Sequence, residues 1–228
     1  MEAKINIRPG TWDKVIAEHV LAGEYGEHEF KGRTVLDIGA HIGSFSLMAC
    51  LGGARRVLAF EAGAANFQLL SANCREFKVI ECHHAAVWRS DVPPGTAQWR
   101  PSANSVNTGG GSVILCASKA GEPRPEGETS PVMQIPLDTI IDQVGVVDLI
   151  KIDAEGSEYP ILFTSRKLNK VREIVGEYHD IEGLDPEFDI PGSRTWNLDG
   201  LATHLHLLGF KVRVQMKSQH GLFHATRP

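Results

Sequence analysis

Three charged residues alternate with apolar ones in the segment LIKIDAEGSE, residues 149–158. Because the side chains of a strand point in turn to its two faces, Lys151, Asp153 and Glu155 should share one face for as long as the strand persists. Ionised groups do not leave water without partners, so this face must meet a ligand or other charges. We expect Asp153 and Glu155, at the carboxyl end of the strand, to face a ligand. Lys151 lies one step deeper, where neutralising carboxylates is a commoner role than catalysis.

The same rim could take a proton from a reacting group. His179 ends the next predicted strand, residues 171–179, and histidine is the side chain whose intrinsic pKa best suits a general base. We expect the base to be Asp153, Glu155 or His179. A histidine that only makes hydrogen bonds at the rim is the alternative role of His179.

A metal ion could use some of the same residues. Asp153 together with Glu177, His179 or Asp180 could bind Mg²⁺ at the ends of the two strands. Mg²⁺ prefers oxygen ligands, and a histidine fits it less well than another aspartate would. Metal dependence is therefore possible here but not favoured.

A glycine-containing loop lies between the first predicted strand, residues 33–39, and the helix that follows it. The loop reads Asp37-Ile38-Gly39-Ala40-His41-Ile42-Gly43, and its two glycines would let a ligand approach backbone amides at a helix N-terminus. Glu61 ends the second predicted strand, where an acidic side chain can bind both hydroxyls of a ribose. Glycines that serve only the backbone conformation of a turn are the simpler explanation. The strand, loop, helix and terminal glutamate together favour a nucleoside ligand.

The loop also distinguishes between nucleoside cofactors. A dinucleotide fingerprint has a third glycine and rests a pyrophosphate on the helix N-terminus, whereas this loop is D-x-G-x-x-x-G. Asp37 beneath the loop would repel a pyrophosphate but suits a cationic sulfonium and its amino-acid tail. We therefore expect Asp37, Gly39, His41, Gly43 and Glu61 to hold S-adenosylmethionine. His41 either makes a polar contact in this site or faces solvent.

Alternating strands and helices are predicted to position these residues. Helices are expected at 12–24, 41–53, 64–74, 137–144, 156–169 and 201–209, and strands at 33–39, 55–61, within 77–87, at 147–153 and 171–179, and in a hairpin at 210–216 and 222–226. Strands that alternate with helices indicate βαβ units with parallel pairing. The expected fold is α/β, a doubly wound Rossmann-like sheet within a single domain, residues 1–228.

Two segments lack this periodicity. Residues 89–131 are rich in Ser, Pro, Gly, Asn and Thr, and only 111–117 could form a strand, so we expect an insertion or long loop there. Residues 180–199 form the second segment, and a loop of that length usually has a function or is disordered. With an N-terminal helical flank, residues 1–30, these segments should wall the substrate side. Tyr25 and Trp196 are the aromatic residues expected in that wall.

The composition excludes several classes of protein. The chain has 228 residues, of which 42% are hydrophobic and 22% charged, as in an ordinary globular domain. Its formal charge of −5 gives no global attraction to nucleic acid or acidic membranes. The four cysteines lack the spacing of a metal site or disulfide framework, and no stretch resembles a signal core or a membrane span. We expect a cytoplasmic protein without nucleic-acid or membrane partners, and its oligomeric state is left open.

Five successive blocks of the sequence resemble the FkbM family of methyltransferases. They are VLDIGAHIGSFSL, AFEAGAANFQLLSAN, NTGGGSV, PLDTI and DLIKIDAEGSEYPIL, in family order from about residue 12 to residue 179. The resemblance implies a class I fold, a seven-stranded mixed sheet with the last strand antiparallel, with S-adenosylmethionine as donor and usually a hydroxyl as acceptor. By position it also implies that Ala86 meets the adenine. One departure is Ala62-Gly63 after Glu61, where the family often has proline.

We therefore expect an O-methyltransferase that acts on a small hydroxylated metabolite, a sugar or a secondary-metabolite scaffold, by in-line methyl transfer. Asp153 would contact both the cofactor and the chemistry. A nucleic-acid methyltransferase is an alternative that the net charge disfavours. An NAD-dependent oxidoreductase would need the missing third glycine, and a cofactor-binding protein without catalysis is the alternative that is not an enzyme.

Overall fold

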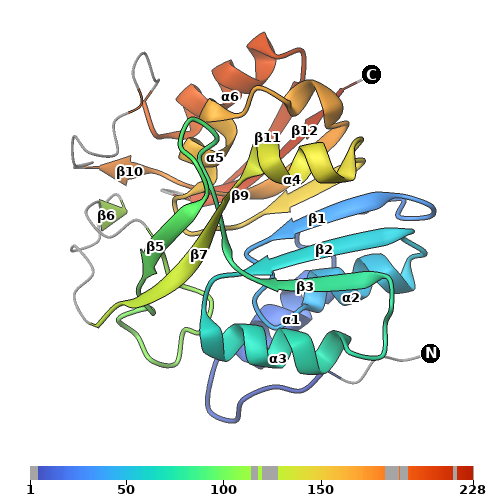
Figure 1. Ribbon diagram of the computed structural model, residues 1–228, viewed down its shortest axis with the longest axis vertical. Coiled ribbons are helices and arrows are strands. Elements are labelled where there is room, and N and C mark those ends of the chain that lie inside the picture. The colour runs from blue at the N-terminus through green and yellow to red at the C-terminus, as the bar shows by residue number, and fades with distance from the viewer. Residues whose placement is uncertain are drawn as a thin grey trace.

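The computed structural model describes residues 5–113, 118–119, 128–182, 190, 195–217 and 220–227. Its central sheet has seven strands in the order β11-β12-β9-β8-β1-β2-β3 (Figure 1). Their bounds are β1 Thr34–Ile38, β2 Arg56–Glu61, β3 Ile80–His84, β8 Leu149–Ile152, β9 Glu173–His179, β11 Lys211–Lys217 and β12 His220–Thr226. β12 pairs antiparallel with both neighbours, and the other six strands share one direction. The predicted seven-stranded sheet with its last strand antiparallel is confirmed.

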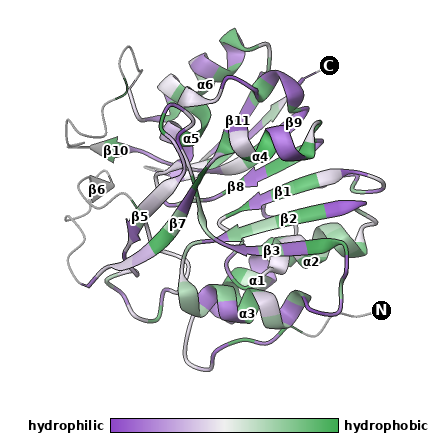
Figure 2. Ribbon diagram, viewed as in Figure 1, coloured by the Kyte–Doolittle hydropathy of each residue, from purple (hydrophilic) through white to green (hydrophobic). Residues whose placement is uncertain are grey.

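Helices cover both faces of this sheet (Figure 1). They are α1 Asp13–Leu21, α2 Ser44–Leu51 and α3 Ala64–Cys74 on one face, and α4 Leu137–Val144, α5 Glu158–Thr164 and α6 Leu198–Leu207 on the other. Because both faces are buried, the central strands are apolar almost throughout rather than alternating. Hydrophobic residues accordingly fill most of β1 and β2 (Figure 2). No helix among the described residues combines the length and apolar character that crossing a membrane requires.

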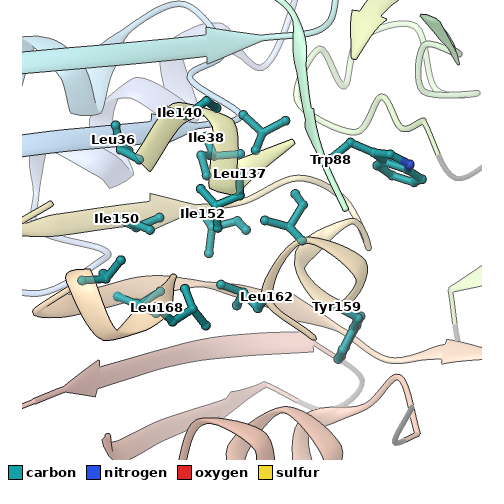
Figure 3. Close-up of a cluster of buried hydrophobic side chains, with 14 of the residues drawn as sticks. Leu36, Ile38, Trp88, Leu137, Ile140, Ile150, Ile152, Tyr159, Leu162 and Leu168 are labelled. Carbon is teal, nitrogen blue, oxygen red and sulfur yellow. The ribbon is translucent and has the colours of Figure 1, made fainter. Parts of the chain in front are cut away.

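Each face has its own hydrophobic core. Alternate residues of one strand serve the two cores: Leu36 and Ile38 of β1 point to the α4–α6 side, and Val35 to the α1–α3 side. Figure 3 shows the first core, where Ile150 and Ile152 of β8 lie beneath α4. Both isoleucines are fully buried, so this strand is held rigidly just before its charged end.

Most predicted elements are present with small changes at their ends. The helices predicted at 64–74 and 137–144 have those bounds as α3 and α4. The helix predicted at 156–169 is shorter, because α5 ends at Thr164 and a 3-10 turn, Leu168–Lys170, follows. The C-terminal helix begins at Leu198, earlier than the predicted 201, because the Asn197 side chain accepts a hydrogen bond from Gly200 N and caps it.

An insertion or long loop is predicted at 89–131, with a strand only at 111–117, and the structure has an insertion with a strand at another place. β5 Gly95–Trp99 and β7 Ser130–Pro136 pair with β4 Ala86–Trp88 in a separate three-stranded sheet, β4-β7-β5. Prolines stand within or beside these strands, and β5 and β7 alternate poorly between buried and exposed residues, so the sequence carries little strand signal there. Of the strand predicted at 111–117, Ser112 forms a single bridge with Arg100, and 114–117 lie outside the described residues.

The segment 180–199 is only partly described. β10 Ile181–Glu182 pairs with β6 Ser118–Lys119, and residues 183–189 and 191–194 lie outside the description. Trp196, expected in the substrate wall, is buried and stacks on Tyr159 with ring centroids 5.8 Å apart. It does not line the cavity described below, because that stack holds it in the core of the α5 side.

Two glycines shape the turn between β1 and α2. Gly39 has a φ of 73°, and a Cβ there would lie 1.8 Å from the backbone oxygen of Asp153. Gly43, the N-cap of α2, has a φ of 95°, and its Cβ would meet Leu70 Cδ1 at 2.9 Å and Cys74 Sγ at 3.0 Å. The first glycine lets the loop touch β8, and the second lets α2 approach α3.

One carboxylate fastens the N-terminal flank to the start of β9. Glu173 Oε1 accepts hydrogen bonds from His28 Nδ1 at 2.9 Å and His224 Nε2 at 2.8 Å, and Glu173 Oε2 accepts from Arg33 Nη1 at 2.5 Å. Burial alone would raise the pKa of Glu173, but these three donors outweigh it and hold the pKa well below its ordinary value. His28 Nε2 also donates to the backbone oxygen of Tyr25, and this bond fixes Tyr25 in the wall of the cavity described below.

Replacing Gly39 by alanine should destabilise the protein far more than the same change at Gly32. Gly32 has nearly the same φ, 72°, but nothing within 4 Å of a new Cβ, so Gly32→Ala adds only left-handed strain of about 1–2 kcal/mol. Gly39→Ala adds a collision with the Asp153 backbone, about 1–3 kcal/mol more. Urea unfolding of both variants measures the difference. Equal losses of unfolding free energy would contradict the close approach.

Glu173→Gln should lower stability in a pH-dependent way. A carboxylate whose folded pKa is depressed stabilises the fold above its unfolded pKa, about 4.3, and this contribution is lost as pH falls through the folded pKa. We expect the variant to be about 1–3 kcal/mol less stable at pH 7, with the gap shrinking below about pH 4. Chemical denaturation at several pH values measures it, with the exposed Glu76→Gln as control. A gap that stays constant with pH would show that the charge of Glu173 is irrelevant.

Candidate cofactor and acceptor site

A cavity of about 430 Å³ opens at the carboxyl ends of β1, β2, β8 and β9. Parallel strands end at a common edge, and a crevice there is where α/β sheets bind ligands. Most of the residues predicted from the sequence line this cavity: Gly39, His41, Glu61, Ala86, Asp153, Glu155 and His179. Asp37 and Gly43 lie behind it and support the loop.

A buried ion pair supports the glycine loop from beneath. Asp37 is fully buried, accepts a hydrogen bond from Ser46 Oγ at 2.7 Å, and lies 3.5 Å from Lys151 Nζ. Lys151 also donates to the Gly39 carbonyl oxygen at 2.7 Å. Lys151 therefore neutralises a carboxylate, as expected, but its partner is Asp37 directly opposite on β1 rather than Asp153 above it. Lys151 thus holds the carbonyl oxygen of Gly39 toward the ion pair and away from the cavity.

Glu61, the last residue of β2, lies directly beside the glycine loop. Its Oε2 accepts from His41 N at 2.8 Å, and its Oε1 accepts from Gly63 N at 2.8 Å and from Asn66 Nδ2 at 3.3 Å. Burial raises the pKa of Glu61, and the hydrogen bonds from Gly63 N, His41 N and Asn66 Nδ2 work against that rise. Two oxygens fixed side by side at the cavity surface suit the two hydroxyls of a ribose.

His41 is buried rather than solvent-facing, which distinguishes its two predicted roles. Its φ is 52°, and its Nε2 lies 2.9 Å from Thr108 Oγ1. Thr108 donates in turn to Asp13 Oδ1 at 2.6 Å, so the ring donates its Nε2 proton to the threonine. His41 Nδ1 is buried and has no hydrogen-bond partner among the described residues. The ring thus joins the glycine loop to Thr108 and, through it, to Asp13.

A hydrogen-bond network that the sequence did not reveal lies next to the glycine loop. Arg8 makes a two-pronged contact with Asp13 at 2.8 and 2.9 Å and donates to Asn66 Oδ1 at 2.7 Å. Asn66 donates to the Thr108 backbone oxygen at 2.9 Å. This network ties the segment before α1 to α3 and to the glycine-rich block at 107–113. Only the NTGGG block gave a signal, because the other partners are single polar residues far apart in the sequence.

The charged segment after β8 turns away from strand geometry. β8 ends at Ile152, and Glu155 has a φ of 55°, so the expected alternation stops before it. Asp153 Oδ2 accepts a hydrogen bond from Tyr25 Oη at 2.7 Å. Glu158 is fully buried and accepts from Ala154 N at 2.7 Å and Gly156 N at 2.8 Å. Glu158 therefore shapes the turn that presents Asp153 and Glu155.

His179 lies among carboxylates at the end of β9. Its Nε2 is 3.6 Å from Glu155 Oε2, its Nδ1 is 3.6 Å from Glu158 Oε1, and Glu177 Oε2 is 4.0 Å from Nε2. These distances are longer than hydrogen bonds, so the ring is not locked by these contacts. Burial, and next the charge of Asp153, raise the pKa of Glu177 to about 7. This corner of the cavity therefore favours a positive charge.

The metal-ligand types predicted here come together in part. One ligand atom each from Asp153, Glu177 and His179 lies within 4.8 Å of the others. Asp180 accepts a hydrogen bond from Leu198 N at 3.1 Å and takes no part in this cluster. The paired histidines before Ala86 point apart, as expected for adjacent strand residues: His83 stacks on Phe60 and His84 on Phe67.

Comparison with known proteins agrees with this geometry. The model of the FkbM methyltransferase domain matches residues 37–210. No curated protein matches the chain significantly.

Two solved structures illustrate the fold. The FkbM methyltransferase of Methylobacillus flagellatus KT aligns at 16% identity and a TM-score of 0.51, covering 88% of this chain and 44% of that one. This chain therefore spans less than half the length of that protein. The precorrin-6y C5,15-methyltransferase of Geobacter metallireducens GS-15 aligns at 11% identity and a TM-score of 0.50, covering 98% and 93%. At such identities the likeness shows the shared fold alone.

The family match is of a different kind, because it covers most of the chain and runs through both halves of the cavity, from Asp37 below the glycine loop past His179 at the acidic rim. The chain belongs to the FkbM family of S-adenosylmethionine-dependent methyltransferases.

Proposed function

We propose that this protein transfers the methyl group of S-adenosylmethionine to a hydroxyl of a small metabolite, such as a sugar or a secondary-metabolite scaffold. One observation carries the proposal: a single cavity joins the glycine loop and Glu61 to the acidic rim with His179. The first half suits a nucleoside, and the second half suits a sulfonium and an acid–base step. A small acceptor is further supported by the net charge of −5, which does not attract nucleic acid.

Binding of the cofactor follows from the two walls. Glu61 takes the ribose hydroxyls, and the backbone of the glycine loop meets the amino-acid tail. The sulfonium then lies toward Asp153 and Glu177, whose charges favour a cation there. The same charges do not suit a pyrophosphate, so this geometry disfavours a dinucleotide.

The transfer itself is a displacement at carbon. The acceptor oxygen attacks the methyl carbon in line with the sulfur, the carbon–sulfur bond breaks, and S-adenosylhomocysteine leaves neutral at sulfur. The hydroxyl proton passes to His179, whose Nε2 faces Glu155, a carboxylate that stabilises the imidazolium formed. Tyr25 holds Asp153 by one oxygen, so that Asp153 keeps a fixed position beside the reacting groups. Glu155 or Asp153 as the base would use the same pocket.

Asp153→Asn and His179→Ala should each lower turnover by about 10²–10⁴-fold, because general base and positioning effects have this size. His179→Ala should leave S-adenosylmethionine affinity nearly unchanged. Release of S-adenosylhomocysteine from a panel of hydroxylated sugars and phenolics measures turnover, and calorimetry measures affinity. His206→Ala, an exposed histidine on α6, is the control. Intact turnover in both variants would refute the catalytic assignment.

A metal-assisted transfer is a second candidate, favoured by the cluster of Asp153, Glu177 and His179. These residues offer two oxygen ligands and one nitrogen, and a divalent cation there would lower the pKa of the acceptor hydroxyl. Histidine is an uncommon ligand for Mg²⁺, so the metal-free route fits the donor set better.

Chelation separates the two routes. After dialysis against a chelator, turnover should persist without added metal. Loss of turnover that added Mg²⁺ or Mn²⁺ restores would instead establish the metal route. Glu177→Gln gives a second readout, because it removes a metal ligand while leaving His179 in place.

A further inference from the structure

Trp99 reaches the cavity from β5, within the segment that the sequence predicted to wall the substrate side. Its indole edge packs against two glycines. A Cβ on Gly63 would lie 2.7 Å from Trp99 Cζ2, and a Cβ on Gly111 would lie 2.4 Å from the same atom. Both distances are shorter than real Cβ contacts, so the indole occupies the space that a side chain at either position would need.

This packing places Trp99 beside Glu61. The position of a Cβ on Gly63 is also 3.0 Å from Glu61 Oε1, so the indole edge and the carboxylate converge on one point. Gly63 follows Ala62, which stands where FkbM sequences often have a proline. The backbone of Gly63 has an ordinary φ of −75°. The glycine therefore serves the close approach of Trp99 rather than an unusual backbone conformation.

The part of the cavity next to this point is apolar. Ala62, Ala85, Ala86 and Val113 line it, and they pack in the same hydrophobic cluster as Trp99. An apolar recess adjoining a carboxylate that suits a ribose matches the polarity of a purine. The wall near Asp153, Glu155 and His179 is acidic and suits that group less well.

We propose that Trp99 forms one wall of the subsite that binds the purine ring of the cofactor. The inserted β5 strand then serves cofactor binding rather than acceptor recognition. This inference rests on the proposed function, because it needs an adenosine ligand at Glu61. Contact between a base and an aromatic ring is favourable for any purine, so Trp99 contributes affinity while Glu61 orients the ribose.

Calorimetric titration of S-adenosylhomocysteine and methylthioadenosine into Trp99→Ala tests the proposal. We expect both ligands to bind roughly 5- to 150-fold more weakly than to the unmodified protein, and Trp99→Phe to recover most of the loss. Trp196→Phe, a tryptophan outside the cavity, is the matched control and should keep full affinity. Methylthioadenosine lacks the amino-acid tail, so an equal loss for both ligands assigns the effect to the adenosine half.

Gly63→Ala gives a second test that spares the indole. Alanine accepts the φ of Gly63, so the variant should fold, yet its Cβ must displace Trp99 and weaken both ligands. Because the same Cβ also approaches Glu61, the change is repeated in the Trp99→Ala background, where its effect should largely vanish. Gly95 lies on β5 with Trp99, and a Cβ there would have no atom within 4 Å. Gly95→Ala should therefore have no effect on binding.

The outcomes separate the two proposals. If the unmodified protein binds neither adenosine ligand, the proposed function fails. The proposal that Trp99 forms the purine wall is overturned if the unmodified protein binds them and folded Trp99→Ala binds them as tightly as Trp99→Phe and the unmodified protein do. Should Trp99→Ala fail to fold, ligand quenching of tryptophan fluorescence decides. Because Trp12 also lines the cavity, quenching should fall more in Trp99→Phe than in Trp12→Phe and should be kept in Trp196→Phe. A change confined to the KM of the methyl acceptor would return Trp99 to the substrate side.

Discussion

The buried pair of Asp37 and Lys151 is the interaction on which the site depends. Removing either partner would leave a charge without compensation in the core, which commonly costs several kcal/mol, whereas the intact pair adds little net stability. Its value lies in geometry. Lys151 binds the Gly39 carbonyl and the Asp37 carboxylate together, so β1, β8 and the loop between β1 and α2 keep one arrangement. The glycine loop and the segment with Asp153 and Glu155 follow directly from these two strands.

Charge runs through the cavity in a consistent order. Lys151 forms its ion pair with Asp37 beneath the loop. The carboxylates above it, Asp153, Glu155 and Glu177, therefore have His179 as their nearby basic side chain. Burial, and next the charge of Asp153, raise the pKa of Glu177 in this corner. A sulfonium carries its positive charge on the sulfur bonded to the methyl carbon that reacts, and methyl transfer removes that charge. The acidic rim therefore suits the cofactor before transfer better than the product after it.

The sequence predicted the parts of this protein whose signals are local. Glycines at a strand end, a glutamate at the next strand end and the charged segment after β8 lie in short, continuous motifs, and these residues do meet in one cavity. It missed what long-range packing decides. The bonds of Arg8 to Asp13 and Asn66 join residues that no short pattern links, and the pairing of β5 with β7 depends on partners rather than on strand propensity. Lys151 was placed correctly but given the wrong partner, because periodicity describes one strand and the ion pair spans two.

The small sheet β4-β7-β5 has a consequence for how the protein folds. β4 pairs in parallel with β7, although the whole segment between Trp88 and Ser130 separates them along the chain. Loop closure of that length costs entropy before any contact repays it, so such pairings form late. The pairing of β1 with β8 beneath the cavity closes a still longer segment, from Val35 to Leu149, so both the floor of the cavity and the wall that carries Trp99 depend on such long-range contacts. A ligand that binds only the finished cavity stabilises these contacts, so cofactor supply and the completion of folding are coupled.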